Sequence, residues 1–254
     1  MNDHAGKTAI VTGGTRGIGA AIVRRLVTEG ARVVFCGRSE DDGRRLQADI
    51  RDDGGAVTYC QADLRHPEEI RAVVETAADV GDGIEIIVNN AAVQSDTGVS
   101  TTPREEWERV VDINFRAYWL LAKYALEHVS EGVIVNISSN HAHQTMPDHF
   151  PYNAIKSGIV GMTKAMAVDL GPAVRANSIS PGWIEVERTR VELSATDRRH
   201  VESIHPVDRI GTPADVAGVV SFLASEDAAF ITGEDIVVDG GRSAVLQDDS
   251  LLKK

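Results

Sequence analysis

Two side chains that could move a proton stand four residues apart in the chain, Tyr152 and Lys156. On a helix, that spacing places both side chains on one face, about one turn apart. A tyrosine normally releases its proton near pH ~10, and a neighbouring ammonium group lowers that pKa because it favours the phenolate. Tyr152 could then exchange a proton with a carbonyl or hydroxyl substrate at neutral pH. The same spacing is also typical of a solvated helix face, so its meaning depends on the rest of the chain.

A glycine-rich segment near the N-terminus could hold a phosphate group. It runs from Thr12 to Gly19, follows an apolar run typical of a strand and opens into a helical pattern. Glycines allow a tight turn and a close approach of a diphosphate, and the helix N-terminus adds unpaired N–H groups. Because strand, glycines and helix occur in that order, the segment predicts dinucleotide binding rather than a plain turn.

The end of the second predicted strand bears on which dinucleotide is bound. An NAD site usually carries a carboxylate there, which binds the ribose hydroxyls of the adenosine. In this chain the strand ends in Phe35-Cys36-Gly37-Arg38-Ser39, with an arginine and no acid. Arg38, together with Arg16, could pair with a 2′-phosphate through forked hydrogen bonds. We therefore expect NADP(H) to be favoured over NAD(H). The alternative is a solvated Arg38 whose field the acidic residues 40–42 partly cancel.

Short β-branched runs alternate with amphipathic helical stretches along most of the chain. The strand candidates are Thr8–Val11, Arg32–Cys36, Ala56–Cys60, Ile84–Val88, Val133–Ile137, Arg175–Ile179 and Asp235–Val238. Between the first two, Ile18, Ile22 and Leu26 recur every four residues, as one buried helical stripe does. Strands that alternate with helices predict right-handed crossovers and a parallel sheet covered on both faces. We expect an α/β fold with a Rossmann-type, doubly wound, mostly parallel sheet of seven strands.

The chain of 254 residues is predicted to form a single domain, 1–254, because we find no internal repeat, low-complexity tract or linker. Two segments lack a clear period. Residues 94–103 form a polar loop, and residues 183–212 form a long, charged insertion that we expect to act as a substrate loop. The polar tail, 242–254, is predicted to be a frayed terminus.

Composition limits the class of protein. The formal net charge of −12 argues against binding to nucleic acid or to an anionic membrane. No apolar run reaches the ~18 residues of a membrane-spanning helix, and the polar N-terminus indicates no signal peptide. Cys36 and Cys60 fall in apolar, strand-like segments and form no disulfide framework. We expect a cytoplasmic protein that binds neither nucleic acid nor membrane.

These motifs, in their order, make the chain resemble the classical short-chain dehydrogenases/reductases from about Lys7 to Gly241. The glycine segment matches the family's T-G-x-x-x-G-x-G. Residues 89–92 match N-N-A-G with alanine in place of the last glycine. Val186 stands where many members carry a threonine that helps to hold the nicotinamide, so the resemblance implies that this contact is lost. It also implies a cofactor site made of Gly13, Thr15, Arg16, Gly17, Ile18, Gly19, Arg38, Ser39, Asp63, Leu64, Asn90, Ala91, Ala92, Tyr152, Lys156, Pro181, Gly182 and Ile184.

The resemblance further implies an oxidoreductase with four catalytic residues, Asn114, Ser139, Tyr152 and Lys156. Tyr152 would donate a proton to the carbonyl oxygen as NADPH delivers hydride to the carbon, and oxidation would reverse both transfers. Lys156 would lower the pKa of Tyr152 and bind the nicotinamide ribose. Ser139 would hold the substrate oxygen, and Asn114 would hold a water that links Lys156 to solvent. Ser138 competes for the serine role, and the family's spacing of thirteen positions before the tyrosine selects Ser139.

The segment between Ser139 and Tyr152 is rich in polar side chains, and in the family it borders the substrate pocket. The expected substrate-binding set is Ser139, His141, His143, His149, Tyr152, Trp183 and Glu187. Such groups would suit a polar, hydroxylated substrate such as a sugar, cyclitol or polyketone. Exposed loop polarity explains them equally well. No metal is expected, because His141-x-His143 lacks the further ligands that a zinc site needs.

The sequence thus predicts an NADP(H)-dependent enzyme that transfers hydride to or from a ketone or secondary alcohol of a small molecule. One alternative is a reductase of 3-oxoacyl thioesters, although an acidic carrier protein would fit such an acidic chain poorly. An alternative of another class is a non-catalytic NAD(P)-binding sensor or scaffold. Such proteins typically lose a catalytic residue, and this chain retains all four. By resemblance we also expect a homodimer or homotetramer assembled through the long helices that contain Asn114 and Tyr152.

Overall fold

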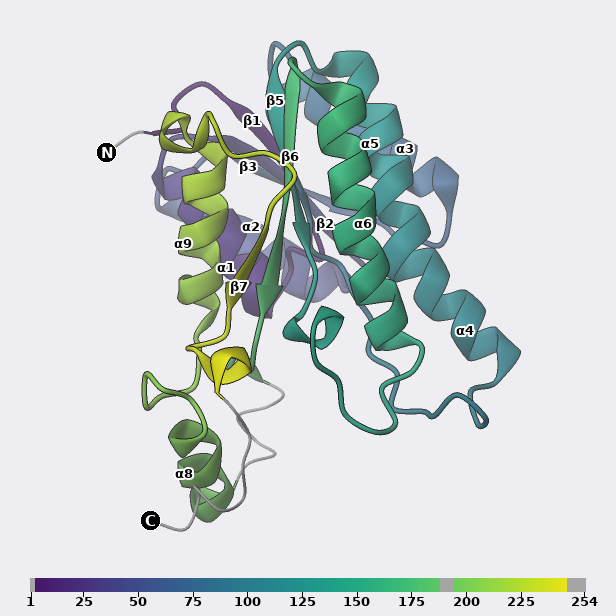
Figure 1. The fold of residues 1–254 in the computed structure, drawn as a ribbon. Coiled ribbons are helices and arrows are strands. Elements are labelled where there is room, and N and C mark those ends of the chain that lie inside the picture. The colour runs from purple at the N-terminus through teal and green to yellow at the C-terminus, as the bar shows by residue number, and fades with distance from the viewer. Residues whose placement is uncertain (1–2, 188–193, 246–254) are drawn as a thin grey trace.

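The computed structural model describes residues 3–187 and 194–245 of the chain. Within these ranges the strands form one parallel sheet in the order β3-β2-β1-β4-β5-β6-β7 (Figure 1). The strands are β1 (Thr8–Thr12), β2 (Arg32–Gly37), β3 (Val57–Gln61), β4 (Ile86–Asn89), β5 (Gly132–Ile137), β6 (Val174–Pro181) and β7 (Asp235–Val238). Each predicted strand segment overlaps one of them. The prediction of a seven-stranded parallel sheet is confirmed.

Helices cover both faces of the sheet, as Figure 1 shows. On one face lie α1 (Gly17–Thr28), α2 (Glu40–Asp52) and α9 (Pro213–Ala224), and on the other lie α3 (Pro67–Val80), α5 (Ala117–Ala125) and α6 (Tyr152–Leu170). Two shorter helices are α4 (Arg104–Val111) and α8 (Ala195–Ser203). The expected stripe on α1 is confirmed, because Ile22 and Leu26 are fully buried and Ile18 packs against the same core. The fold is the doubly wound α/β fold that the sequence predicts.

The order of the strands places a crevice at the centre of the sheet. β1 pairs with β2 on one side and with β4 on the other, so the chain winds outward in both directions from β1. The loops that leave the carboxyl ends of β1 and β4 therefore turn to opposite faces, and ligands bind in the crevice between such loops. Thr12 ends β1 and Asn89 ends β4.

A buried chain of hydrogen bonds attaches α6 to the sheet. Asn89 and Asn136 are paired in register on β4 and β5, and the Asn89 amide nitrogen donates to the Asn136 side-chain oxygen at 2.9 Å. The Asn136 amide nitrogen in turn donates to the Thr163 hydroxyl on α6 at 2.9 Å. All three side chains are fully buried. The network fixes the rotation of α6, the helix that begins at Tyr152.

Two expectations about irregular segments differ from the structure. The segment 183–212 contains helix α8 and therefore is not a continuous loop, and residues 188–193 lie outside the described residues. The tail does not fray from residue 242 onward, because Arg242–Ala244 form a 3₁₀ turn, η5. The buried Asp239 carboxylate holds this turn by accepting backbone N–H groups of Gly241 and Ser243 at 3.0 and 2.8 Å. Residues 246–254 lie outside the described residues.

We expect the Asn136→Ala variant to lose about 1–3 kcal/mol of unfolding free energy, because the substitution removes the bonds from Asn89 and to Thr163 and leaves the buried Asn89 amide only the longer bond to the Tyr118 carbonyl. The exposed substitution Glu75→Ala on α3 is a control that should change it by less than about 0.5 kcal/mol. Urea unfolding followed by circular dichroism measures both. Equal stability of the two variants would contradict the role of the network.

Candidate active site

The glycine-rich loop after β1 is shaped for the close approach of a ligand. Gly13 has a φ of +63°, a conformation that residues with a Cβ rarely adopt. At Gly19, a Cβ atom would lie 2.1 Å from the Gly13 carbonyl oxygen, so no larger residue fits there. The N-terminus of α1 has no side-chain cap and no acidic residue in its first turn. Its N–H groups are therefore available to a diphosphate, and these residues fit a dinucleotide.

The loops after β1 and β4 are held together by Thr12 and Asn90. The Thr12 hydroxyl accepts the backbone N–H groups of Asn90 and Ala91 at 2.9 and 3.1 Å. The Asn90 amide donates to the carbonyl oxygens of Thr12 and Gly13 at 2.9 and 3.1 Å. These bonds fix the glycine loop against the N-N-A-A segment.

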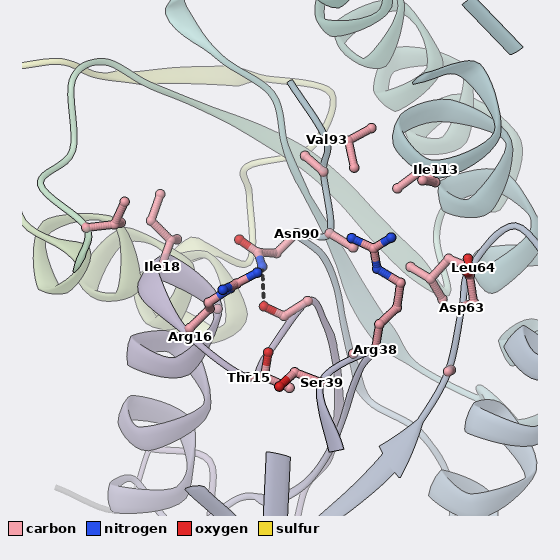
Figure 2. A pocket seen from close by; sticks show the side chains of 17 residues that line it. Thr15, Arg16, Ile18, Arg38, Ser39, Asp63, Leu64, Asn90, Val93 and Ile113 are labelled. Carbon is pink, nitrogen blue, oxygen red and sulfur yellow. Dashed lines mark hydrogen bonds between the residues drawn. The ribbon is translucent and has the colours of Figure 1, made fainter. Parts of the chain in front are cut away.

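A cavity of about 590 Å³ opens over these loops (Figure 2). The predicted cofactor residues that line it are Gly13, Thr15, Arg16, Ile18, Gly19, Arg38, Ser39, Asp63, Leu64, Asn90, Ala91 and Ala92. The sequence did not single out Gly37, Ala62, Val93 and Ile113, which also line it. Of the predicted set, Gly17 lines no cavity described here. Its φ of +57° shapes the loop instead.

Two arginines and one aspartate are the charged side chains that line this cavity within the described residues. Figure 2 shows that Arg38 extends from the end of β2 toward the segment that contains Asn90 and Val93. The Asp63 carboxylate is held by Arg65, whose Nε lies 3.0 Å from both carboxylate oxygens. This pairing lowers the pKa of Asp63 to about 2. The acid is therefore neutralised by Arg65, while Arg38 faces the cavity.

A second cavity of about 580 Å³ shares Ile18, Asn90, Ala92 and Val186 with the first, so the two form one continuous cleft. Ser139, Tyr152 and Lys156 line this second cavity, and so do the predicted cofactor residues Pro181, Gly182 and Ile184. The structure thus brings the end of β5, the first turn of α6 and the end of β6 to one opening. Their segments meet because the carboxyl ends of parallel strands lie at the same edge of a sheet.

Lys156 is 1% exposed, and its ammonium nitrogen donates to the Ile137 carbonyl oxygen at 2.7 Å. The nitrogen also lies 5.5 Å from the centre of the Tyr152 ring. Burial disfavours the charged form and lowers the pKa of Lys156 to about 7. The predicted pair therefore shares one face of α6.

Asn114 sits in a π-helical turn, η1 (Asp112–Arg116), and is fully buried. Its side-chain oxygen accepts the Val93 N–H and its side-chain nitrogen donates to the Val93 carbonyl, both at 2.8 Å. The amide is thus bound to the backbone that follows the N-N-A-A segment. The sequence did not predict this contact, which joins η1 to the backbone of Val93, a residue that lines the cofactor cavity.

The two neighbouring serines differ in what they contact. The Ser138 hydroxyl donates to the Lys156 carbonyl at 2.8 Å, so it ties β5 to α6. Ser139 lines the cavity, and its hydroxyl accepts the backbone N–H of His141 at 3.2 Å. Both serines line the cavity, but the Ser138 hydroxyl uses its proton on the Lys156 carbonyl, whereas the Ser139 hydroxyl accepts from a backbone N–H.

The predicted substrate-binding histidines separate in the structure. The His141 ring stacks on His149 at 4.5 Å between centroids and meets the Tyr152 ring edge-on at 6.0 Å, and His141 and His149 both line the cavity. Burial, with smaller contributions from His149 and Arg242, lowers the pKa of His141 to about 4. His143 differs from the expectation. Its Nε2 lies 2.6 Å from Asp235 on β7, and it does not line the cavity.

Of the two substrate-loop residues that were predicted, Trp183 lines the cavity. Glu187 is exposed and does not line it. Arg242 and Ser243 line it instead, although the sequence assigned them to a frayed tail. Their place in the cavity becomes visible only when the polar turn after β7 is located in the structure. No local motif in the sequence marks that turn.

In the described part of the chain, no group of three or more histidine, cysteine, aspartate or glutamate side chains is arranged to hold a metal ion. Cys36 and Cys60 are free thiols there. Within the same residues, no helix combines the length and apolar character needed to cross a bilayer.

Comparison with known proteins identifies the class. A family model described as enoyl-(acyl carrier protein) reductase matches residues 13–243. An "uncharacterized oxidoreductase" of Thermotoga maritima is 38% identical over 93% of this chain and 95% of its own length. "Dehydrogenase/reductase SDR family member 4" of Bos taurus is 37% identical over 92% of this chain and 86% of its own length. The crystal structure of a gluconate 5-dehydrogenase from Burkholderia cenocepacia in complex with NADP and tartrate is 30% identical, with a TM-score of 0.88 over 96% of this chain and 99% of that one.

The chain therefore belongs to the short-chain dehydrogenase/reductase family. It is an NAD(P)-dependent oxidoreductase that acts on CH–OH or C=O groups, as the sequence predicted.

The buried Lys156 makes a pH-dependent prediction about stability. Its pKa of about 7 in the folded protein lies below the ordinary value of 10.5, so the unfolded chain binds one more proton between these pH values. The unfolding free energy should therefore rise with pH in that window, by up to about 1.4 kcal/mol per pH unit from this group. Urea unfolding at pH 7.5 and 9.5 should show a smaller rise in Lys156→Met than in the wild type. The exposed Lys164→Met on the same helix should keep the full rise, and an identical slope in all three proteins would contradict the assignment.

Proposed function

We propose that this protein is an NADP(H)-dependent dehydrogenase/reductase of a polar, hydroxylated ketone or secondary alcohol. The observation that carries the proposal is the continuous cleft, in which Ser139, Tyr152 and Lys156 open onto a cavity that shares four lining residues with the dinucleotide cavity. A substrate in the second cavity would therefore lie beside the nicotinamide end of a cofactor in the first. The chain also retains all four predicted catalytic residues, which argues against the alternative of a non-catalytic sensor or scaffold.

Each residue would have a separate role. The nicotinamide, when bound, supplies or accepts the hydride. Tyr152 donates a proton to the substrate oxygen during reduction and removes it during oxidation. Ser139 donates a hydrogen bond to the same oxygen and holds it near the phenol. Lys156 favours the phenolate when it is protonated, and it lines the cleft, where it would bind the ribose hydroxyls. Asn114 acts as a positioning residue through Val93.

Four observations support NADP(H) over NAD(H). Arg38 and Arg16 line the cofactor cavity, and the one carboxylate among its described lining residues is paired with Arg65. No acid follows β2 within that lining to bind the ribose hydroxyls. A guanidinium group binds phosphate through forked hydrogen bonds, so a 2′-phosphate fits this end of the cavity. The similar gluconate 5-dehydrogenase is described in complex with NADP.

The lining of the second cavity supports a hydroxylated substrate. Asn140, Gln144 and Thr145 add polar groups to His141 and His149. A gluconate 5-dehydrogenase is among the similar structures. The alternative is reduction of an acyl thioester, which the description of the matching family model favours. Comparison of NADPH oxidation with a polyhydroxy ketone, acetoacetyl-CoA and crotonyl-CoA separates ketone, 3-oxoacyl and enoyl reduction.

We also propose that the protein is cytoplasmic and assembles as a homodimer or homotetramer. Large apolar side chains are exposed on the described chain, with Phe230 fully exposed, Val168 82% exposed on α6 and Trp119 49% exposed on α5. Exposed apolar area of this kind is typical of subunit contacts. The free thiols of Cys36 and Cys60 suit a reducing compartment.

We expect Tyr152→Phe to lower kcat by about 10²–10⁴-fold, because the variant lacks the group that transfers the proton. NADPH affinity, measured by fluorescence titration, should change little, since the ring and Lys156 remain. The half-buried Tyr124 on α5 does not line the cleft, so Tyr124→Phe is the matched control and should keep wild-type turnover. A Tyr152→Phe enzyme with wild-type turnover would refute the enzyme role assigned to this phenol.

The Arg38→Ala variant tests the choice of cofactor. The wild type should have a higher kcat/KM with NADPH than with NADH, and the variant should lose about 10- to 100-fold of that preference, because a charge-assisted bond to the phosphate is removed. Arg44→Ala removes an exposed arginine of α2 that does not line the cavity, and it should keep the preference. A wild type that prefers NADH would refute the proposed role of Arg38.

A further inference from the structure

The substrate cavity differs in charge from the chain that encloses it. The chain carries 38 acidic residues against 26 lysines and arginines. Yet no aspartate or glutamate is among the described residues that line this cavity, whereas Arg242, Lys156, His141 and His149 all line it. A cavity walled by cations and neutral groups concentrates anions, and the surrounding acidic surface makes this local sign a property of the site rather than of the whole protein.

Arg242 is held in place by the polar turn that follows β7. The Asp239 carboxylate is 7% exposed and accepts the N–H groups on both sides of Arg242, from Gly241 and Ser243. The Gln144 amide donates to the Ser243 carbonyl at 3.0 Å, which ties the turn to the loop that carries His141 and His149. Arg242 therefore lines the cavity from a turn whose backbone is fixed on both sides of it.

The charge of Arg242 is not neutralised by an ion pair with any residue in 3–187 or 194–245. Asp239, the nearest acid along the chain, uses its carboxylate on backbone N–H groups. Lys156 and His141, two other basic side chains of the lining, are less suited to bind an anion. Lys156 is buried beside Tyr152 and donates to Ile137, and burial lowers the pKa of His141 to about 4, so that ring is neutral at physiological pH. Arg242 is thus the permanent cation among the described residues that line the cavity.

We propose that the substrate of this protein is an anionic hydroxy or oxo compound, and that Arg242 binds its carboxylate or phosphate while its alcohol or ketone carbon lies at Ser139 and Tyr152. A guanidinium group binds either anion through two parallel hydrogen bonds. The inference rests on the proposed function, because it assumes that the reacting oxygen lies at Tyr152. Arg242 then selects substrates by charge and orients them along the cleft.

Three matched compounds test the charge requirement in the full-length protein with NADP⁺. Gluconate, sorbitol and sorbitol 6-phosphate share a polyhydroxy chain, and they end in a carboxylate, a neutral hydroxymethyl group and a phosphate. We expect kcat/KM to be at least about 10-fold higher for one of the anions than for sorbitol, and the preferred anion identifies the group. In Arg242→Ala the ratio of anion to sorbitol should fall by about 10- to 100-fold, and Arg242→Lys should restore part of it. Arg104→Ala, an exposed arginine of α4 outside the cleft, should keep the wild-type ratio.

A binding measurement distinguishes failure of this inference from failure of the proposed function. Calorimetric titration of the Tyr152→Phe protein with NADP⁺ bound should show tighter binding of the preferred anion than of sorbitol, and loss of the difference when Arg242→Ala is added. Oxidation of sorbitol with NADP⁺, or reduction of the neutral diketone 2,3-butanedione with NADPH, without any preference for the anions would overturn the inference and leave the proposed function standing. Anion binding that depends on Arg242 without turnover of any of these compounds would support the anion site and count against the proposed function. Absence of Arg242-dependent binding of either anion would overturn the inference.

Discussion

The hydrogen bonds between the ends of β1 and β4 are the interaction on which the rest of the site depends. In a parallel sheet the two loops at the switch point diverge to opposite faces, and nothing in the sheet itself holds them together. Thr12 and Asn90 exchange four hydrogen bonds with each other's loop backbone. The contact continues through Val93 to the buried amide of Asn114. Because Asn90 lines both cavities, this single contact sets the position of the cofactor crevice relative to the substrate cavity.

The burial of Lys156 lowers the stability of the folded protein but places an amine where it can assist proton transfer at Tyr152. A buried ammonium group loses its hydration, and one hydrogen bond to the Ile137 carbonyl only partly compensates. The buried Asn89–Asn136–Thr163 network and the Ser138 bond to the Lys156 carbonyl keep α6 from moving to relieve that cost. The fold thus holds a titratable amine next to Tyr152, where it would be least stable and most useful to a proton transfer.

Much of the fold follows from the sequence because its signals are local. Apolar strand runs and the four-residue stripe of Ile18, Ile22 and Leu26 depend on neighbours within a few residues, and the sheet and α1 confirm them. The glycine loop is equally local, since φ at Gly13 and the contact at Gly19 arise within seven residues. The predicted cofactor residues line the cleft almost throughout for that reason. The departures at Ala92 and Val186 fall where the two cavities meet, so they alter the lining without closing the cleft.

The sequence by itself determined the family motifs, the order of the motifs along the chain and the Tyr152–Lys156 pair on α6, because motif spacing along a helix or a tight turn fixes geometry directly. Only the tertiary structure decided which histidine faces the cleft. His141 and His143 are two residues apart, yet one stacks on His149 and the other bonds to Asp235, 92 residues further along the chain. The same holds for Arg242, which the sequence assigned to a polar tail and which the Asp239 turn brings to the substrate cavity. Both contacts depend on where β7 lies at the edge of the sheet. No local pattern of residue types in the sequence specifies that position.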